Sequence, residues 1–121
     1  MITVFTPTFN RAYTLNKLFD SLQIQTCKDF EWLIIDDGSE DGTAKLVKEK
    51  FIPNALFPTR YIYKSNEGKN AAINDAALLS EGEYVFIVDS DDYLSDDAIE
   101  TVSMYISSIE NSSDKWGGSR P

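Results

Sequence analysis

Residues Tyr84–Asp92 have the sequence Tyr-Val-Phe-Ile-Val-Asp-Ser-Asp-Asp, in which an apolar, β-rich run ends in three carboxylates. Residues Trp32–Ser39 repeat this arrangement, because an apolar run is followed there by Asp-Asp-Gly-Ser. Both runs have the length and composition of buried strands. Mg²⁺ and Mn²⁺ prefer oxygen ligands and often share them with phosphates. Two acidic strand ends in one short chain therefore indicate a site for a nucleotide and a divalent cation.

The segments around these two runs alternate between strand-like and helix-like patterns. We expect strands at residues 2–6, 31–35, 60–63 and 84–88, with the first one ending at Pro7. Helical spacing of apolar residues follows each strand. This order predicts an α/β fold in which a mostly parallel sheet is covered by helices. Ligands of such folds bind beyond the carboxyl ends of the strands, where the strand order reverses.

The C-terminal part of the sequence predicts one more helix and a tail. The helix should begin near Ser95, which is a good N-cap, and Asp96 and Asp97 suit its positive N-terminal dipole. Its buried stripe is predicted to be Ile99, Val102, Ile106 and Ile109. Residues 1–110 are expected to form one domain, whereas the polar residues 111–121 are expected to form a flexible tail.

Composition excludes several classes of partner. The chain has 121 residues, a net charge of −9 and no histidine, so its surface repels nucleic acids and anionic lipids. Cys27 is the single cysteine, which rules out an internal disulfide and is compatible with a reducing compartment. Without a histidine it cannot form a Cys-His nucleophile, so we expect it to pack in the fold. No apolar run approaches the roughly 20 residues of a membrane span, and the start lacks a signal-peptide layout. We expect a cytoplasmic protein, with peripheral attachment to a membrane as the alternative.

The carboxylates at residues 89–92 allow two interpretations. Asp89 and Asp91 are alternate residues of an extended segment, so both could face one ion, with Asp92 beside them. Alternatively, the segment is a solvated turn in which Asp92 helps to cap the last helix. The second acidic strand end favours the metal interpretation.

The turn Asp36–Ser39 is also open to two interpretations. Asp-Gly is a common turn pair, and Ser39 or Asp41 could cap the following helix. That explanation does not require two adjacent aspartates. One carboxylate could accept the imide N–H of a uracil ring while its neighbour holds the loop.

Two further loops carry weaker signals. Residues Pro7–Arg11 could be a plain strand-to-helix connection capped by Asn10, or Phe9 could pack near a base. Lys69, in the turn at residues 66–70, could be solvated or could meet a phosphate at a helix N-terminus.

Taken together, these loops resemble family 2 glycosyltransferases of the GT-A fold. The matching strings are Thr6–Arg11, Asp29–Glu31, Asp36–Ser39 with Asp41 and Thr43, Asn66-x-Gly68-Lys69 with Ala72 and Asn74, Glu81–Tyr84, and Asp89–Asp92. The match covers roughly residues 2–109. The resemblance implies a nucleotide-diphospho-sugar donor, Mn²⁺ or Mg²⁺ as cofactor, and inversion at the anomeric carbon.

The resemblance also implies roles for individual residues. The nucleotide-binding residues would be Pro7, Thr8, Asn10, Arg11, Asp37, Lys69 and Ser90. The metal at the diphosphate would be held by the DXD-type motif, with Asp91 as the main ligand and Asp89 and Asp92 beside it. Many members have Arg before the residue that matches Asn74, where this chain has Ile73; Lys69 could supply that positive charge.

Family enzymes continue past the metal motif into an acceptor-binding half that usually carries the catalytic base. No residue here matches that position, so we assign no catalytic residue and expect the chain by itself to transfer little sugar. The expected partners are a UDP-sugar and a saccharide or lipid-linked acceptor, and an exposed apolar face could support a homodimer. The alternatives are a non-catalytic module that binds a nucleotide or nucleotide-sugar, and a cation-binding α/β domain.

Overall fold

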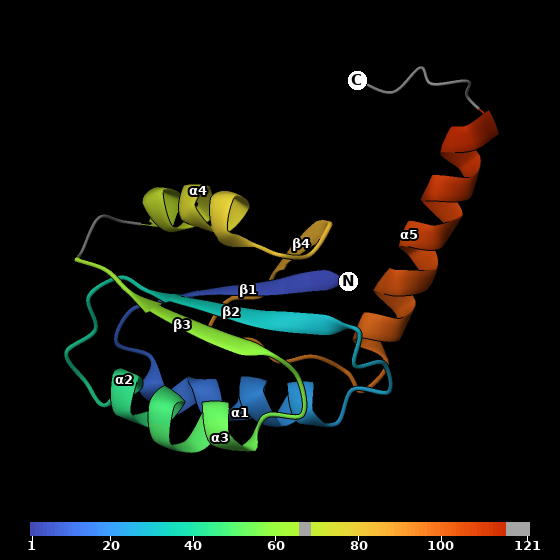
Figure 1. Cartoon of the computed structure of the whole chain (residues 1–121). Coiled ribbons are helices and arrows are strands. Elements are labelled where there is room, and N and C mark those ends of the chain that lie inside the picture. Colours follow the sequence, from blue (N-terminus) through green and yellow to red (C-terminus); the bar gives the residue numbers. More distant parts are fainter. Residues whose placement is uncertain (66–68, 116–121) are drawn as a thin grey trace.

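Four parallel strands form the centre of the computed structural model, in the order β3-β2-β1-β4 (Figure 1). Their bounds are Ile2–Thr8 for β1, Phe30–Asp36 for β2, Thr59–Tyr63 for β3 and Tyr84–Ile87 for β4. The structure describes residues 1–65 and 69–115; of residues 69–73 and 112–115 it describes the backbone alone. The parallel pairing confirms the predicted α/β fold class.

Helices cover both faces of the sheet. On one face lie α1 (Ala12–Gln23) and a continuous helical run made of α2 (Thr43–Leu46), η1 (Val47–Phe51) and α3 (Ile52–Asn54). On the opposite face lies α4 (Lys69–Leu79), and α5 (Ala98–Lys115) extends away from the end of the sheet (Figure 1). Both faces of β2 are therefore covered, and all of its residues are buried.

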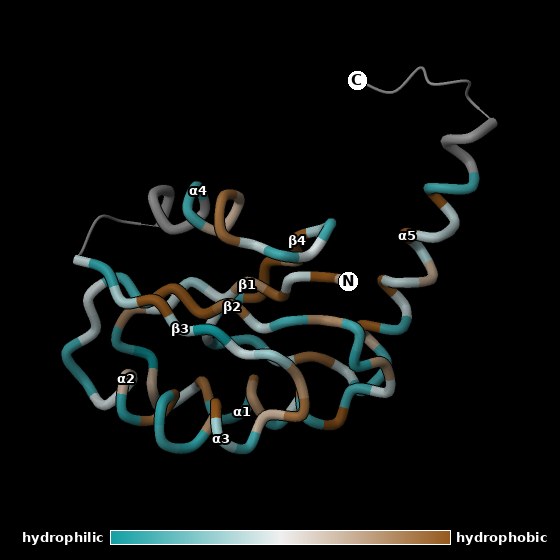
Figure 2. Tube along the Cα trace, viewed as in Figure 1, coloured by the Kyte–Doolittle hydropathy of each residue, from teal (hydrophilic) through white to brown (hydrophobic). Residues whose placement is uncertain are grey.

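The two faces carry cores of different size. The larger core joins α1 and the run at residues 43–54 to the sheet, and Figure 2 shows the apolar colouring of the strands between the helices. Its aromatic centre stacks Phe19 on Phe51, with ring centroids 4.4 Å apart, and places Trp32 against both rings. The smaller core lies under α4 and consists of Phe5, Leu33, Ile35 and Ala76, with Ile62 packed against it.

β4 is an edge strand of the described part of the sheet, since it pairs with β1 only. Its side chains alternate between half-buried and exposed positions. Val85 is 41% exposed and Ile87 is 46% exposed, although both are large and apolar. The edge of the sheet at β4 is thus less covered than the centre.

β1 extends two residues further than the sequence predicts. Pro7 was expected to end the strand, but it pairs with Ile35, and Thr8 pairs with Asp36. Proline cannot donate a ladder hydrogen bond and is therefore tolerated mainly at sheet edges. β4 pairs with β1 only from Ile2 to Phe5, so β1 is an edge at Pro7 on that side.

The helical run at residues 43–54 contains a π-helical turn, η1, in its middle. The sequence predicts a helix here, with a loop from Pro53 onward, but the run continues through Asn54. Pro53 has no N–H to donate to the preceding turn, and wider turns accommodate such a loss. Val47 and Phe51, at the two ends of η1, are both fully buried.

α5 differs from its predicted helix at its start and in its buried stripe. It begins at Ala98 rather than near Ser95, whose hydroxyl donates to Asp97 instead of capping. Ile99 is fully buried and Val102 and Ile106 pack against the core, but Ile109 is 39% exposed because α5 extends beyond the sheet there. α5 continues to Lys115, so residues 111–115 of the predicted tail are helical.

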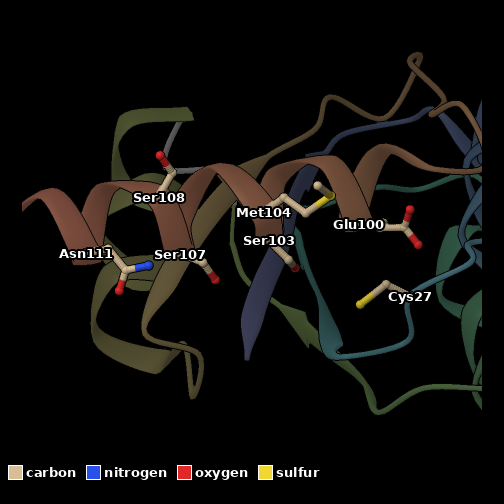
Figure 3. Close-up of a pocket in the computed structure, with 7 residues that line it drawn as sticks. All are labelled: Cys27, Glu100, Ser103, Met104, Ser107, Ser108 and Asn111. Carbon is tan, nitrogen blue, oxygen red and sulfur yellow. The ribbon is translucent and has the colours of Figure 1, made fainter.

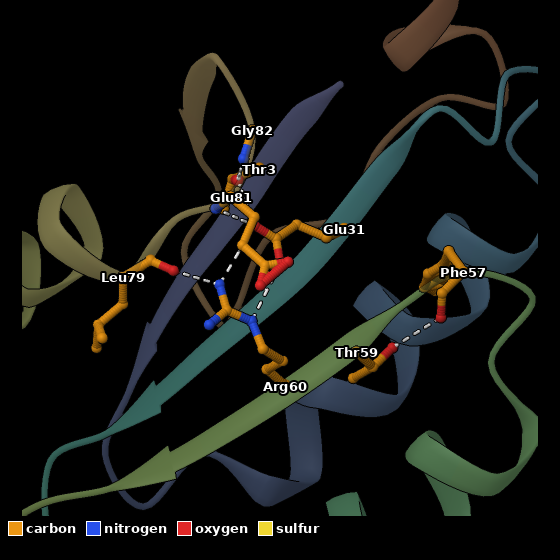
Figure 4. Close-up of polar contacts among 8 residues, drawn as sticks. All are labelled: Thr3, Glu31, Phe57, Thr59, Arg60, Leu79, Glu81 and Gly82. Atoms are coloured by element: carbon orange, nitrogen blue, oxygen red, sulfur yellow. Dashed lines mark hydrogen bonds and ion pairs between the residues drawn. The ribbon is translucent and has the colours of Figure 1, made fainter.

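A buried carboxylate ties the strands together at their amino-terminal ends (Figure 4). Glu31 accepts hydrogen bonds from the Thr3 hydroxyl at 2.6 Å, from the Glu81 N–H at 2.7 Å and from the Arg60 guanidinium. Burial would raise the pKa of Glu31, but these bonds and the guanidinium charge lower it below its usual value of 4.5. Gly82 donates to Thr3, and a Cβ on Gly82 would lie 2.6 Å from the Thr3 nitrogen, so only glycine fits there.

Cys27 precedes β2 and packs against the larger core, as predicted from the sequence. It also lines an open hollow of about 490 Å³ beneath α5, toward which the hydroxyls of Ser103 and Ser107 point (Figure 3).

Within residues 1–65 and 69–115, no helix combines the length and the apolar character that crossing a membrane requires.

Candidate functional site

The strand order reverses at β1, which lies between β2 and β4. The chain moves outward from β1 to β2 and β3, and then returns to the other side of β1 to form β4. Such a switch point opens a crevice between the loops at the carboxyl ends of the two flanking strands. The loops after β1, β2 and β4 all leave the sheet at this edge, and they carry the predicted site residues.

The loop after β4 is a tight acidic turn. Val88 donates to the Phe5 carbonyl and so extends the β1–β4 pairing by one residue, and Asp92 donates to the Asp89 carbonyl at 3.0 Å. Asp89, Asp91 and Asp92 each offer a carboxylate oxygen that lies within 4.8 Å of the other two. Asp89 is half-buried, whereas Asp91 and Asp92 are exposed. Three oxygen donors gathered this closely are the kind of ligand that hard divalent cations use.

Helix α1 holds the acidic turn in place. The Thr14 hydroxyl donates to the Ser90 carbonyl at 2.7 Å, and the Lys17 ammonium lies 5.7 Å from the centre of the Tyr93 ring. Ser90 itself is buried. The first turn of α1 therefore contacts the backbone of the acidic turn.

The loop after β2 assigns different tasks to its two aspartates. Asp36 is fully buried, and its carboxylate accepts from the Ser39 N–H at 2.8 Å and from the Tyr61 hydroxyl at 2.5 Å. Asp37 is only half-buried, and its N–H donates to the Thr8 carbonyl. Gly38 has a φ of 92°, which glycine adopts without strain. The sequence left open which of the two aspartates holds the loop, and the structure shows that Asp36 does so.

Hydrogen bonds also join the loop after β1 to the loop after β2. The Asn10 N–H donates to the Ser39 hydroxyl at 2.7 Å, and the Asn10 side-chain carbonyl accepts from the Glu40 N–H at 2.9 Å. Asn10 has a φ of 51°, a conformation that asparagine tolerates better than most residues. Ser39 therefore does not cap α2, and Asn10 holds the neighbouring loop rather than capping α1.

Asp41 completes this link between the two loops. Its carboxylate accepts from the Ala12 N–H at 3.1 Å and from the N–H and hydroxyl of Thr43 at the start of α2. Burial would raise the pKa of Asp41, but the bonds from Thr43 and Ala12 outweigh it and lower the pKa below its usual 3.8.

The pKa of the Tyr61 phenol is shifted in the opposite direction. Burial and then the Asp36 carboxylate raise it well above its usual 10.0.

Thr8 carries an unsatisfied buried hydroxyl next to these loops. It is 4% exposed, and its Oγ1 has no hydrogen-bond partner within residues 1–65 and 69–115. Buried polar atoms are usually paired, so this hydroxyl has a hydrogen bond left to make at the carboxyl end of β1.

The structure brings most of the predicted site residues to this edge of the sheet. Pro7 and Thr8 end β1, Asn10 and Arg11 are exposed in the following loop, and Arg11 donates to the Tyr13 hydroxyl. Phe9, a candidate neighbour of a base, is 44% exposed. Of the predicted turn at residues 66–70, residues 66–68 and the Lys69 side chain lie outside the described part of the chain, and residues 69–70 already belong to α4.

Sequence reasoning missed the side chains that attach the segment after β4 and the β2 loop to neighbouring elements. Thr14 and Ser21 on α1, and Gln25 just after its end, bind residues 90–99, while Tyr61 reaches the β2 loop from β3. The 2% exposed Gln25 accepts from the Ile99 N–H and so caps the first turn of α5 from a distant part of the chain. Their partners lie 25 to 76 positions away in the sequence, so the local sequence carries no signal for these bonds.

An acidic turn at the switch point of a parallel sheet places the chain among α/β proteins that bind ligands at the carboxyl ends of their strands. Residues 3–113 match the sequence profile of Glycosyl transferase family 2, and the chain belongs to this family, as its loops predicted.

Individual proteins with similar sequences are also glycosyltransferases by name. Glycosyltransferase GlyA of Streptococcus pneumoniae is 37% identical over 101 residues, which cover 84% of this chain and 14% of that protein. Poly(ribitol-phosphate) beta-N-acetylglucosaminyltransferase TarP of Staphylococcus aureus is 35% identical over 116 residues, covering 93% of this chain and 34% of that protein. The chain thus spans only about a third or less of the length of these relatives.

Solved structures share the fold. The 1–349 fragment of S. aureus TarS in complex with UDP matches with a TM-score of 0.79 and 30% identity, over 88% of this chain and 32% of that one. The mannosyltransferase PcManGT from Pyrobaculum calidifontis, in complex with GDP-Man and Mn²⁺, matches with a TM-score of 0.70 and 28% identity, over 76% of this chain and 28% of that one. The fold is therefore of the GT-A type that the sequence predicted.

Proposed function

We propose that this chain is the donor-binding part of an inverting, metal-dependent glycosyltransferase that uses a nucleotide-diphospho-sugar, with a UDP-sugar as the preferred donor. The observation that carries the proposal is the convergence of Asp89, Asp91 and Asp92 at the switch point of the sheet, beside the loop that carries Asp37. Structural relatives in complex with UDP, with UDP-GlcNAc, and with GDP-Man and Mn²⁺ support it.

In this proposal the loops after β1 and β2 bind the nucleoside. Asp37 accepts the imide N–H of the base, and the end of β1, with the unpaired Thr8 hydroxyl and Pro7, lies beneath it. The Asn10 side-chain carbonyl is occupied by Glu40, which leaves its NH₂ group for the nucleoside. Arg11 and Lys69 supply positive charge for the phosphates of a donor that a net charge of −9 would otherwise repel.

The carboxylates of the acidic turn hold Mn²⁺ or Mg²⁺, with Asp91 as the main ligand and Ser90 beside the diphosphate. When bound, the cation neutralises the negative charge that develops on the diphosphate leaving group, which is a Lewis-acid role. The protein contributes the turn geometry that presents the carboxylates together and the loops that orient the nucleoside.

The experiment is calorimetry of UDP binding to the 121-residue chain in Mn²⁺ and in EDTA. We expect clearly tighter binding in Mn²⁺, and Asp91→Asn should remove most of the difference, because it removes the main ligand. Asp20→Asn, at an exposed position on α1, is the matched control and should retain the enhancement. Equal affinity in Mn²⁺ and EDTA for the unmodified chain would contradict the metal dependence.

The role of Asp37 has a separate test. A hydrogen bond from the base to a carboxylate contributes about 1.5–3 kcal/mol, so Asp37→Ala should weaken UDP binding by about one to two orders of magnitude. Binding of inorganic pyrophosphate should change far less. If both ligands weaken equally, the loop has collapsed and Asp37 does not contact the base.

A donor-turnover assay separates the enzyme from a non-catalytic binding module. The 121-residue chain is incubated with radiolabelled UDP-sugars, Mn²⁺ and pooled acceptors, and both transfer and hydrolysis are measured. Binding with neither transfer nor hydrolysis favours the binding module for this chain.

A further inference from the structure

We propose that Thr14 on α1 is a positioning residue for the acidic turn and thereby sets the affinity of the site for the divalent cation. The inference rests on the proposed function, because it assigns to Thr14 the task of holding Asp89, Asp91 and Asp92 in a cation-binding arrangement. Thr14 touches neither nucleotide nor cation in this scheme, and it acts through the Ser90 backbone.

The geometry identifies Ser90 as the partner of the Thr14 hydroxyl. Its Oγ1 lies 2.7 Å from the Ser90 carbonyl and 3.0 Å from the Arg11 carbonyl, but a hydroxyl has one proton to donate. The Arg11 carbonyl already accepts from the N–H groups of Thr14 and Leu15. The Thr14 hydroxyl therefore donates its proton to the Ser90 carbonyl, which is the shorter contact and belongs to a distant loop.

Ser90 is the residue between the two carboxylates that the cation needs most. Asp89 precedes it and Asp91 follows it, so rotation of the Ser90 peptide group would move the two side chains relative to each other. The turn's own backbone bond, from Asp92 to the Asp89 carbonyl, closes the turn but leaves the Ser90 carbonyl to be fixed from outside. Thr14 fixes it from a helix that is itself anchored by the buried Leu15 and Leu18.

Further along the same side of α1, Ser21 provides a comparison. Its hydroxyl accepts from the Leu94 N–H at 3.1 Å and donates to the Leu18 carbonyl. Ser21 thus holds the same loop segment, four residues beyond Ser90 and past the carboxylates. A residue that merely attaches the segment to α1 should behave like Ser21, whereas a positioning residue should affect the cation.

The test measures UDP affinity in Mn²⁺ and in EDTA for the unmodified chain, Thr14→Val, Thr14→Ser and Ser21→Ala. Residues that orient metal ligands typically change metal affinity by about 10–100-fold. We expect Thr14→Val to reduce the Mn²⁺ enhancement about tenfold while the affinity in EDTA changes less than about twofold. Thr14→Ser keeps the hydroxyl and should restore the enhancement, and Ser21→Ala should retain it even if it unfolds at a lower temperature.

A second measurement needs no cation. Amide hydrogen exchange at Asp92, which donates to Asp89, should be faster in Thr14→Val than in Ser21→Ala. If the unmodified chain shows no Mn²⁺ enhancement, the proposed metal function fails, and faster exchange in Thr14→Val would still support the structural half of the inference. If the enhancement is present and Thr14→Val retains it in full, the inference about Thr14 is overturned and the proposed function stands.

Discussion

The loops after β2 and β4 lie on either side of the end of β1, yet they are built in opposite ways. The β2 loop has its key carboxylate, Asp36, fully buried and bonded to Ser39 and Tyr61. The β4 loop presents Asp91 and Asp92 to solvent and gathers three like charges within 4.8 Å. The Asp36 carboxylate has its partners within the fold, whereas the three carboxylates of the β4 loop repel one another in the absence of a cation. The difference separates an aspartate that stabilises the fold from aspartates that we propose bind a cation.

The largest expected effect comes from making the same substitution in both loops. Asp36→Ala leaves the Ser39 N–H and the Tyr61 hydroxyl without their acceptor, which should lower the free energy of unfolding by about 2–4 kcal/mol. Asp91→Ala removes an exposed carboxylate from a crowded cluster, so the free energy of unfolding should change by less than about 0.5 kcal/mol. Urea unfolding in EDTA measures the free energy of unfolding of both variants. A similar loss in the two variants would remove the distinction between the loops.

A smaller effect distinguishes two tyrosines on β3. The Tyr61 hydroxyl donates to the buried Asp36 carboxylate, while the Tyr63 hydroxyl lies 3.4 Å from the Ser39 carbonyl and its residue is 55% exposed. Tyr61→Phe should lower the free energy of unfolding by about 1–2 kcal/mol, and Tyr63→Phe should lower it by only a few tenths of a kcal/mol. Thermal unfolding of the two variants side by side provides the measurement. Equal costs would mean that Asp36 does not depend on Tyr61.

The smallest expected effect is the pH dependence of the stability that Asp41 contributes. The folded pKa of Asp41 lies below its usual 3.8, so its stabilising contribution is present above that pH and is lost as the pH falls through the folded pKa. The difference in unfolding free energy between the unmodified chain and Asp41→Asn should therefore be greatest near neutral pH and shrink in acid. Asp20→Asn serves as the exposed control. A difference that stays constant with pH would show that the Asp41 charge contributes nothing to this loop.

The sequence predicts the fold well because its strands and helices have strong, local patterns. Strands at Ile2–Thr6 and Tyr84–Val88 are apolar and bounded by turn residues, and the α-helical spacing between strands implies a parallel sheet. The family resemblance follows from loops at fixed places in that order. These features need only neighbouring residues to be recognised.

The predictions that failed concern choices that tertiary contacts make. Pro7 continues β1 because β4 is too short to reach it, and the start of α5 is capped by Gln25 from the segment that follows α1. Ser39 has the residue type of a cap, yet Asn10 occupies its hydroxyl. Thr14 gave no signal at all, because its partner is 76 positions away.

Charged residues flank the outer strand of the described part of the sheet. β4 exposes Val85 and Ile87, and within residues 1–65 and 69–115 it pairs with β1 only, which is the kind of edge on which other chains add strands and aggregate. The exposed Glu83 stands before this strand and the acidic turn follows it, so charge flanks the apolar segment at both ends, as aggregation gatekeepers do. Substitutions that neutralise the turn to test the proposed cation binding should therefore also make the chain more prone to aggregate. The same few aspartates would thus affect both ligand binding and colloidal stability.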